Sequence, residues 1–447
     1  MPSNPPKPNI LFILTDQQRW DTLHCYGNSL DISPHLDTLA RDGVRFEFAF
    51  TCQPVCGPAR SCLQTGRYAT ETGCWRNGIG LPLDALTLPR LLCPAGYEIG
   101  YIGKWHLAST PPDINFETKA VPPEYRGGYD DFWLASDVLE FTSHGYDGHM
   151  FDSDMLRVDF PPGRYRADAL TDFAVDYLRT RSRKIPFFLF LSYVEPHFQN
   201  DHRHFEGPQG SKQRFRDVPV PADLRGKDGD WREEYPDYLG CCAGLDENVG
   251  RLRSELAALG IAENTLIIYT SDHGCHFRTR NREYKRSCHE SSIRVPMILL
   301  GPGFFGGHVI TELASLIDLP PTVLNAAGVA PPSAMRGRPL QPLVRGEVRD
   351  WPQEVFVQIS ESQTGRALRT KRWKYSVSVP GQPEGTSQPT AEVYHAEYLY
   401  DLENDPHELV NSVREPDLKE LRTDLAERLR KLMVAAGEKE PEILSAG

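Results

Sequence analysis

Four apolar runs in this chain each end abruptly in polar residues, and this feature constrains the fold more than any other. Continuous apolar runs of this kind are typical of strands buried on both faces of a parallel sheet. Segments with helical patterning alternate with them, which predicts an α/β fold: a large, mostly parallel sheet sandwiched by helices. The four runs cover residues 9–15, 97–102, 186–194 and 264–270; two further strands are expected at 44–50 and 295–300, and helices at 33–43, 86–92, 167–181, 238–259 and 318–327.

Polar side chains follow all four runs directly. In open α/β sheets the ligand binds outside the carboxyl ends of the strands, so these side chains are expected to meet at one edge. A single aspartate after a strand is usually a turn or cap residue, but four such clusters together favour a functional site. The clusters are Asp16-Gln17, Lys104 with His106, His197, and Asp272-His273.

From about residue 350 the pattern changes to shorter strands and one closing amphipathic helix. The strands are expected at 355–359, 367–370, 373–379 and 398–401, and the helix at 417–436. We therefore predict a main domain over residues 1–350, which carries the site, and a small α+β subdomain over 351–447. Residues 111–162 and 198–231 show little periodicity and are expected to form long loops that shape a pocket.

Charge and cysteine content exclude some classes of function. The net charge is −12, which argues against nucleic-acid binding because phosphate contacts need a basic surface. The apolar runs are too short for a signal-peptide core or a membrane span, so we expect a cytoplasmic protein without membrane attachment. The ten cysteines have no metal-type spacing and are interpreted as reduced thiols of the core. The sequence does not define the oligomeric state.

The segment that begins at Cys56 carries the most specific pattern in the chain. Pro58 suits the first turn of a helix, so Cys56 is expected at a helix start, where free N–H groups favour negative charge. Arg60, one turn further on, can reach back to the same point. A lone cysteine is usually a buried core residue, but this setting favours a reactive one. The segment reads Cys56-Gly57-Pro58-Ala59-Arg60, then Leu63, Thr65-Gly66 and Arg67-Tyr68.

This pattern resembles the C-x-P-x-R signature of the type I, formylglycine-dependent sulfatases of the alkaline-phosphatase-like superfamily. Gly57 and Ala59 stand where serine is frequent in that family. The resemblance covers most of the chain and implies the alkaline-phosphatase-like fold. Other segments similar to the family are Gly103-Lys104-Trp105-His106-Leu107, Ser292-Ile293-Arg294-Val295-Pro296 and Tyr400-Asp401-Leu402-Glu403-Asn404-Asp405-Pro406.

The resemblance also implies roles for individual residues. Cys56 would be oxidised by a formylglycine-generating enzyme, and the hydrate of the formylglycine would be the nucleophile, with His106 acting on it. Arg60, Lys104 and Lys285 would hold the negative charge. His197 would protonate the leaving alcohol. Substrate binding would fall to Lys104, His197, Lys285 and Asn77, the last by its match to an asparagine of phosphonate monoester hydrolases.

A divalent metal is the expected cofactor beside formylglycine. Asp16, Gln17, Asp272 and His273 match the family's four metal-binding positions, and Cys56, once oxidised, adds a ligand. Carboxylate and amide oxygens suit Ca²⁺ or Mg²⁺, whereas the imidazole nitrogen of His273 also suits Mn²⁺. We expect Ca²⁺.

These observations together predict a sulfatase, which converts a sulfate monoester to an alcohol and inorganic sulfate. The expected substrate is a sulfated carbohydrate or an aryl sulfate, as a small molecule or an oligosaccharide. Gln17, His273 and Asn77 also occur in phosphonate monoester hydrolases, so hydrolysis of a phosphonate monoester or phosphodiester is an alternative, although Lys104 with His106 favours the sulfatase. A second alternative is an unmodified relative that binds a sulfated glycan without cleaving it.

Overall fold

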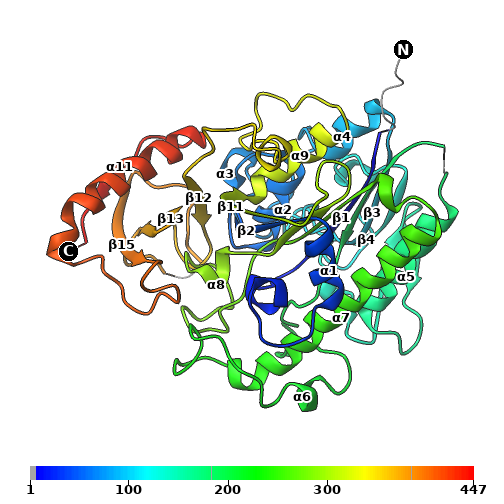
Figure 1. The fold of residues 1–447 in the computed structure, drawn as a ribbon, viewed down its shortest axis with the longest axis horizontal. Helices are drawn as coiled ribbons and strands as arrows, with labels where there is room; N and C mark the ends of the chain where they lie inside the picture. The colour runs from blue at the N-terminus through cyan, green and yellow to red at the C-terminus, as the bar shows by residue number, and fades with distance from the viewer. Residues whose placement is uncertain (1–6, 183, 384, 447) are drawn as a thin grey trace.

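The computed structural model describes residues 7–182, 184–383 and 385–446, which form two β-sheets with helices packed around them (Figure 1). The larger sheet has the strand order β11-β2-β10-β9-β1-β8-β3-β4-β6-β5, and β7 pairs with β6. The smaller sheet has the order β12-β13-β14-β15-β16. The predicted α/β architecture with a second, smaller unit is confirmed.

The elements have the following bounds. The strands of the larger sheet are β1 (Asn9–Thr15), β2 (Val44–Phe50), β3 (Glu98–Lys104), β4 (Phe132–Ser136), β5 (Ser143–His144), β6 (Asp147–Asp152), β7 (Arg157–Asp159), β8 (Phe187–Ser192), β9 (Thr265–Ser271), β10 (Met297–Leu300) and β11 (His308–Ser315). The helices beside it are α1 (Pro34–Asp42), α2 (Cys56–Thr65), α3 (Ala69–Thr72), α4 (Leu88–Leu92), α5 (Arg166–Thr180), α6 (Ser211–Arg214), α7 (Trp231–Ala258), α8 (Glu290–Ile293), α9 (Leu319–Ala326) and α10 (Gln341–Val344).

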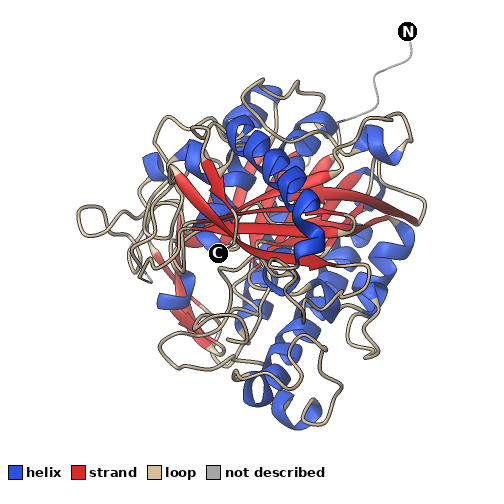
Figure 2. Cartoon of the chain, turned by 90° about the vertical axis from the view of Figure 1, so that its left-hand side faces the viewer, coloured by secondary structure: helices blue, strands red, loops and turns tan. Residues whose placement is uncertain are grey.

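The centre of the larger sheet is parallel: β1 pairs with β8 and β9, and β3 pairs with β8. Every residue of β1 is buried because its side chains alternate between two cores. Ile10, Phe12 and Leu14 pack with residues of α2, α4 and α9, whereas Leu11 and Ile13 pack with residues of α1, α5 and α7. Helices thus cover both faces of the sheet (Figure 2), which leaves the strand ends as the place for a site.

The structure corrects two parts of the predicted secondary structure. Residues 111–162, predicted as long loops, contain β4 to β7, and β4 pairs in parallel with β3. The edge strand β11, which pairs in parallel with β2, was not predicted either. These strands are short or partly exposed, so they lack the continuous apolar run that marks a buried strand. β10 runs antiparallel to β9 and β2, so the sheet is mostly, not wholly, parallel.

The smaller sheet is an antiparallel meander, with β16 added in parallel at its edge. Val355, Val357 and Ile359 pack against Phe50 and Leu313 of the larger sheet, so the two units share a core. The division at residue 350 stays a prediction. The elements are β12 (Glu354–Ile359), β13 (Gly365–Thr370), β14 (Trp373–Ser378), β15 (Val393–Asp401), α11 (Lys419–Ala435) and β16 (Glu442–Leu444).

All ten cysteines lie in the described residues and carry free thiols, and eight of them are buried. This agrees with their interpretation as reduced thiols, mostly in the core. Over the ranges that the structure describes, the helices are too short or too polar to span a membrane.

Candidate active site

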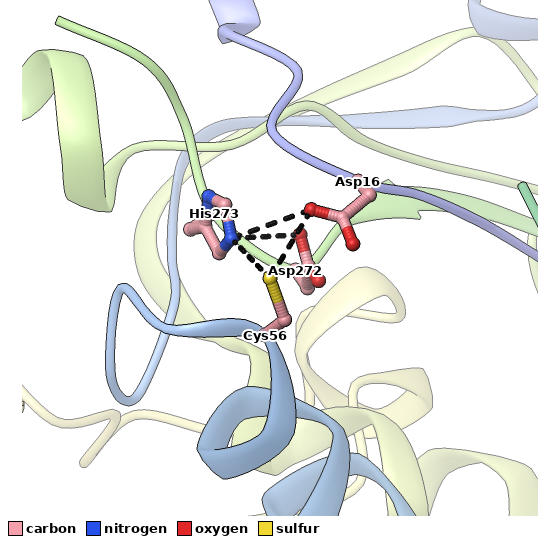
Figure 3. A group of neighbouring side chains, drawn as sticks. All are labelled: Asp16, Cys56, Asp272 and His273. Carbon is pink, nitrogen blue, oxygen red and sulfur yellow. Dashed lines mark hydrogen bonds and ion pairs between the residues drawn. The ribbon is translucent and has the colours of Figure 1, made fainter. Parts of the chain in front are cut away.

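The predicted polar clusters meet at one edge of the larger sheet. β1, β8 and β9 end side by side, and the chain leaves them through Asp16, His197 and Asp272. The start of α2 approaches the same edge and places Cys56 against Asp16 and His273 (Figure 3). The parallel register of the strands therefore assembles the site from segments far apart in sequence.

Asp16, Cys56, Asp272 and His273 form a fully buried group of potential metal ligands (Figure 3). Each residue offers one donor atom, and these atoms all lie within 4.8 Å of one another. His273 Nε2 is 3.3 Å from Cys56 Sγ and 3.4 Å from Asp16 Oδ1. The other ring nitrogen, Nδ1, donates to the Gly274 carbonyl oxygen at 3.0 Å, which leaves the lone pair of Nε2 directed at the group.

The electrostatics of this group favour a bound cation. Burial raises the pKa of Asp272 to about 6, and the adjacent Asp16 carboxylate adds to this effect. Asp272 Oδ2 makes no hydrogen bond within the described chain and has Arg60 Nη2 as an ion-pair partner at 3.4 Å. A divalent cation would stabilise both carboxylates in their ionised form and would use the imidazole lone pair, so the residues present fit a metal ion.

Gln17 lies beside these four donors. Its backbone has a φ of 73°, and its N–H donates to Asp272 Oδ1 at 3.1 Å. The side-chain amide Nε2 donates to Cys275 Sγ at 3.4 Å, which leaves the amide oxygen as the atom available to an ion. Gln17 also lines the cavity in front of Cys56.

Lys285 connects the cysteine with the predicted acid. Its Nζ donates to Cys56 Sγ at 2.9 Å and lies 2.9 Å from His197 Nε2. Burial and the charge of Lys285 lower the pKa of His197, so its Nε2 accepts a hydrogen bond here. Burial alone would raise the pKa of Cys56, but Lys104 and Lys285 hold it well below its usual range. Negative charge at the position of this thiol is therefore stabilised.

Arg60 and Lys104 are buried next to this cavity and hold the carboxylates in place. Lys104 Nζ donates to Asp16 Oδ2 at 2.8 Å, and Arg60 Nη2 donates to the same oxygen at 3.1 Å. Arg60 also donates to the Lys104 carbonyl oxygen at 2.8 Å and to Ser192 Oγ at 2.6 Å. Burial would raise the pKa of Asp16, but Lys104, His197 and Lys285 keep it low. Arg60 and Lys104 therefore orient Asp16 beside the cavity and do not line the cavity themselves.

His106 and Asn77 both line the cavity. His106 has a φ of 58°, and its side chain helps to lower the pKa of Cys56. Asn77 Oδ1 accepts from the Gly57 N–H at 2.9 Å and so caps the start of α2. Asn77 therefore combines a structural role with a place where it can meet the substrate.

Two carboxylates of the site were missed by the sequence analysis. Glu140 accepts from Lys104 Nζ with Oε1 at 2.7 Å, while its buried Oε2 makes no hydrogen bond among the described residues. Asp137 accepts from the Leu107 and Ala108 N–H groups at 3.0 and 2.9 Å and so fixes the loop after β3. Both residues follow β4. Recognition of that strand would have placed Asp137 among the strand-end residues.

The cavity in front of Cys56 has a volume of about 190 Å³. Tyr284 lies in its wall and stacks on Phe198 with ring centroids 4.2 Å apart. His289 lies outside this lining, and its Nε2 is 3.1 Å from the hydroxyl of Tyr400 in the smaller sheet. The lining comprises Gln17, Cys56, Asn77, Gly78, His106, Glu117, Val138, Glu140, Phe141, His197, Phe198, Asn200, Glu283, Tyr284, Lys285 and Arg286.

The site lies at the strand ends of a mostly parallel sheet and combines four potential metal ligands with buried cationic side chains, as expected for a hydrolase of the alkaline-phosphatase-like class. The sequence matches the family model described as Sulfatase over residues 8–329. It also matches the model described as N-sulphoglucosamine sulphohydrolase, C-terminal, over residues 282–435. The chain therefore belongs to the sulfatase family and is an enzyme that hydrolyses sulfate esters, as the resemblance implied.

Similar proteins act on sulfated carbohydrates. An ulvan-active sulfatase of Formosa agariphila is 30% identical over 97% of this chain and 82% of its own length. An N-acetylglucosamine-6-O-sulfatase of Bacteroides thetaiotaomicron is 26% identical over 78% of this chain and 74% of its own length.

Solved structures share the fold. A structure in complex with its substrate D-glucosamine-2-N,6-O-disulfate superimposes with a TM-score of 0.78 at 23% identity and covers 97% of this chain and 99% of its own. The phosphonate monoester hydrolase of Agrobacterium radiobacter superimposes with a TM-score of 0.72 at 21% identity over 96% of both chains. The two kinds of enzyme thus share one fold, so only the residues of the site can distinguish sulfate-ester from phosphonate hydrolysis.

Proposed function

We propose that this sulfatase hydrolyses a sulfate monoester of a carbohydrate, with formylglycine made from Cys56 and with Ca²⁺ held by Asp16, Gln17, Asp272 and His273. One observation carries the proposal: Lys285 Nζ lies 2.9 Å from both Cys56 Sγ and His197 Nε2. One cavity is thus lined by residue 56, by Lys285 as the cation for the sulfate, and by His197 as the proton donor for the leaving alcohol.

The charges of the site support an anionic substrate. Three cationic side chains, Arg60, Lys104 and Lys285, stand against three carboxylates, Asp16, Asp272 and Glu140. These charges balance before an ion enters. A bound divalent cation would leave two positive charges in excess, which match a sulfate ester and an ionised nucleophile.

Each residue of the chain has a distinct task in this proposal. Formylglycine would supply a nucleophile at neutral pH, and Ca²⁺ would stabilise negative charge on it and on the sulfuryl oxygens. Lys285 binds a sulfate oxygen beside residue 56. His197 Nε2 gives a proton to the leaving alcohol, because the arriving negative charge raises the pKa of this histidine. His106 accepts a proton from residue 56.

The size and lining of the cavity support a sulfated sugar residue as the part of the substrate that binds there. Its volume of about 190 Å³ corresponds to roughly six water molecules of liquid, enough for a sulfate group and part of one sugar ring. Aromatic and hydrogen-bonding side chains line it together, as in sites that stack a sugar face and bind its hydroxyls. The similar sulfatases of carbohydrates point the same way.

Phosphonate or phosphodiester hydrolysis is the competing activity. Gln17, His273 and Asn77 favour it, and the shared fold permits it. Lys104 and His106 favour the sulfatase, because Lys104 ties Asp16 to Glu140 and His106 faces residue 56.

Two measurements test the proposal. Protein made with a formylglycine-generating enzyme should show an aldehyde mass at Cys56 in the tryptic peptide of residues 46–60, trappable by a hydrazide. The same protein should release sulfate from glucosamine 6-sulfate or an aryl sulfate faster than it cleaves a phosphonate monoester at equal concentration. Faster phosphonate cleavage would favour the alternative hydrolase, and binding without sulfate release would favour the glycan-binding relative. The cytoplasmic location stays a prediction.

Substitution of Glu140 by glutamine is expected to lower kcat/KM by about 10- to 100-fold. The reason is that Lys104 loses a charged hydrogen bond of roughly 1.5–3 kcal/mol and the cavity loses an acceptor for a substrate hydroxyl. The Glu117→Gln variant is the control, since Glu117 lines the same cavity but bonds only to Asn115 among the described residues. If the Glu140→Gln variant has the kcat/KM of the wild type, Glu140 has no role in substrate binding or catalysis.

A further inference from the structure

Beside the active site, two loop segments bring together three histidines and two carboxylates. His144 lies at the end of β5, and the other four residues belong to the segment 201–206. We call this group the rim cluster: His144, Asp201, His202, His204 and Glu206. Possible ligand atoms of His144, Asp201 and His202 lie within 4.8 Å of one another, as do those of His202, His204 and Glu206. His202 thus belongs to both sets.

The inner atoms of the rim cluster face one another in nitrogen–oxygen pairs. His144 Nε2 is 2.9 Å from Asp201 Oδ2, and His202 Nδ1 is 2.5 Å from Glu206 Oε1. The His144 and His202 rings stack with centroids 4.0 Å apart and an interplanar angle of 10°. Two imidazolium rings stacked face to face would repel each other, so protonation of both histidines does not account well for this arrangement.

The outer atoms of the same side chains are already occupied. Asp201 Oδ1 accepts from Gln199 Nε2 at 2.8 Å, and Glu206 Oε2 accepts from the Gly145 N–H at 2.6 Å. His144 Nδ1 is 3.0 Å from Asp147 Oδ1, and His204 Nδ1 donates to the Phe205 carbonyl oxygen at 3.0 Å. Outer bonds of this kind fix the tautomer and orientation of metal ligands.

We propose that the rim cluster is a second metal site, which takes a borderline divalent cation such as Zn²⁺. Its ligands are His144, Asp201 and His202, and Glu206, paired with His202, supplies the fourth. Mixed imidazole and carboxylate donors favour Zn²⁺ over Ca²⁺, which prefers six or more oxygens. The site is therefore distinct in chemistry from the oxygen-rich group around Asp16.

The rim cluster is coupled to the cavity by two adjacent residues. Gln199 Nε2 donates to Asp201 Oδ1 and also to the Glu140 carbonyl oxygen, at 2.7 Å. Asn200 lines the cavity. The bridge between Gln199 and His204 closes the loop on itself. A cation at the rim cluster would thus fix the loop that carries one wall of the substrate cavity.

Titration of the calcium-saturated enzyme with ZnCl₂ in a calorimeter at neutral pH tests this proposal. The wild type is expected to bind one zinc ion more than the His144→Ala/His202→Ala variant, with a dissociation constant on the order of 1 μM. Zinc in hundredfold excess over that constant is expected to raise the melting temperature of the wild type by about 3 °C and that of the variant by less. The His308→Ala variant, which removes an exposed histidine of β11, is the matched control and should behave as the wild type.

Equal zinc stoichiometry and affinity in the wild type and the double variant would overturn the proposal, as would the absence of zinc binding to the wild type. The Asp201→Asn variant provides a second check, because the amide can keep the bond from Gln199 while the ligand charge is lost. It should bind the additional zinc ion at least tenfold more weakly. Wild-type affinity in this variant would also contradict the site.

Discussion

Replacement of Cys56 by serine is expected to lower kcat for sulfate release by roughly 10⁴- to 10⁶-fold, the effect of removing a catalytic nucleophile. Serine keeps a side chain of similar size at the start of α2 and has an oxygen in place of the Cys56 sulfur. It cannot be oxidised by the same route to an aldehyde, so residue 56 would carry one hydroxyl instead of two. A sulfate transferred to that oxygen could leave only by slow hydrolysis.

The measurement is sulfate release under multiple turnover, together with the mass of the peptide of residues 46–60 after one turnover. The serine variant should release at most one equivalent of alcohol and keep sulfate on residue 56. Cys93→Ser, which changes the exposed cysteine, should retain wild-type activity. Continuous turnover by the serine variant would contradict covalent catalysis at residue 56 and would leave metal-activated water as the nucleophile.

The central strands of this fold are well predicted from the sequence, because the signal for a strand buried on both faces lies within the strand itself. β1, β8 and β9 are buried on both faces, so a continuous apolar run marks each of them. The same argument fails for β11 and for β6, which expose part of their surface and pair by long-range contacts. Such strands are stabilised by the neighbour they pair with, and a single sequence does not show the neighbour.

The residues of the candidate site divide in the same way, into those predictable from local sequence and those that depend on long-range contacts. Asp16, His197 and Asp272 stand where buried strands end, so their convergence could be predicted from the sheet. Glu140 could not, because its place depends on β4 and on an ion pair with Lys104. The rim cluster arises from two irregular segments that carry no periodicity and that meet through long-range contacts, among them the hydrogen bond from the Gly145 N–H to Glu206.

Replacement of Asp272 by asparagine is expected to have opposite effects on the metal-free and metal-loaded protein. Burial and the Asp16 carboxylate raise the pKa of Asp272 to about 6 in the folded protein without metal. In the unfolded chain this group ionises near its ordinary pKa of about 3.9. The folded state thus binds the proton more tightly, so stability falls as pH rises from about 4 to about 6. At neutral pH the asparagine variant should be more stable than the wild type in EDTA, by on the order of 2 kcal/mol.

In calcium the order should reverse, because the wild type gains binding energy that the variant lacks. Thermal unfolding with EDTA and with excess calcium measures both differences, and the variant should also lose roughly 10³-fold or more in kcat/KM. Asp246→Asn is the matched control: Asp246 is buried on α7, its pKa is likewise raised by burial to about 6, and it accepts from the His35 and Leu36 N–H groups. This control should keep wild-type activity and the full calcium shift. An Asp272→Asn variant with an unchanged calcium shift would mean that the ion binds elsewhere, whereas lower stability in EDTA would mean that Asp272 acts chiefly as the partner of Arg60.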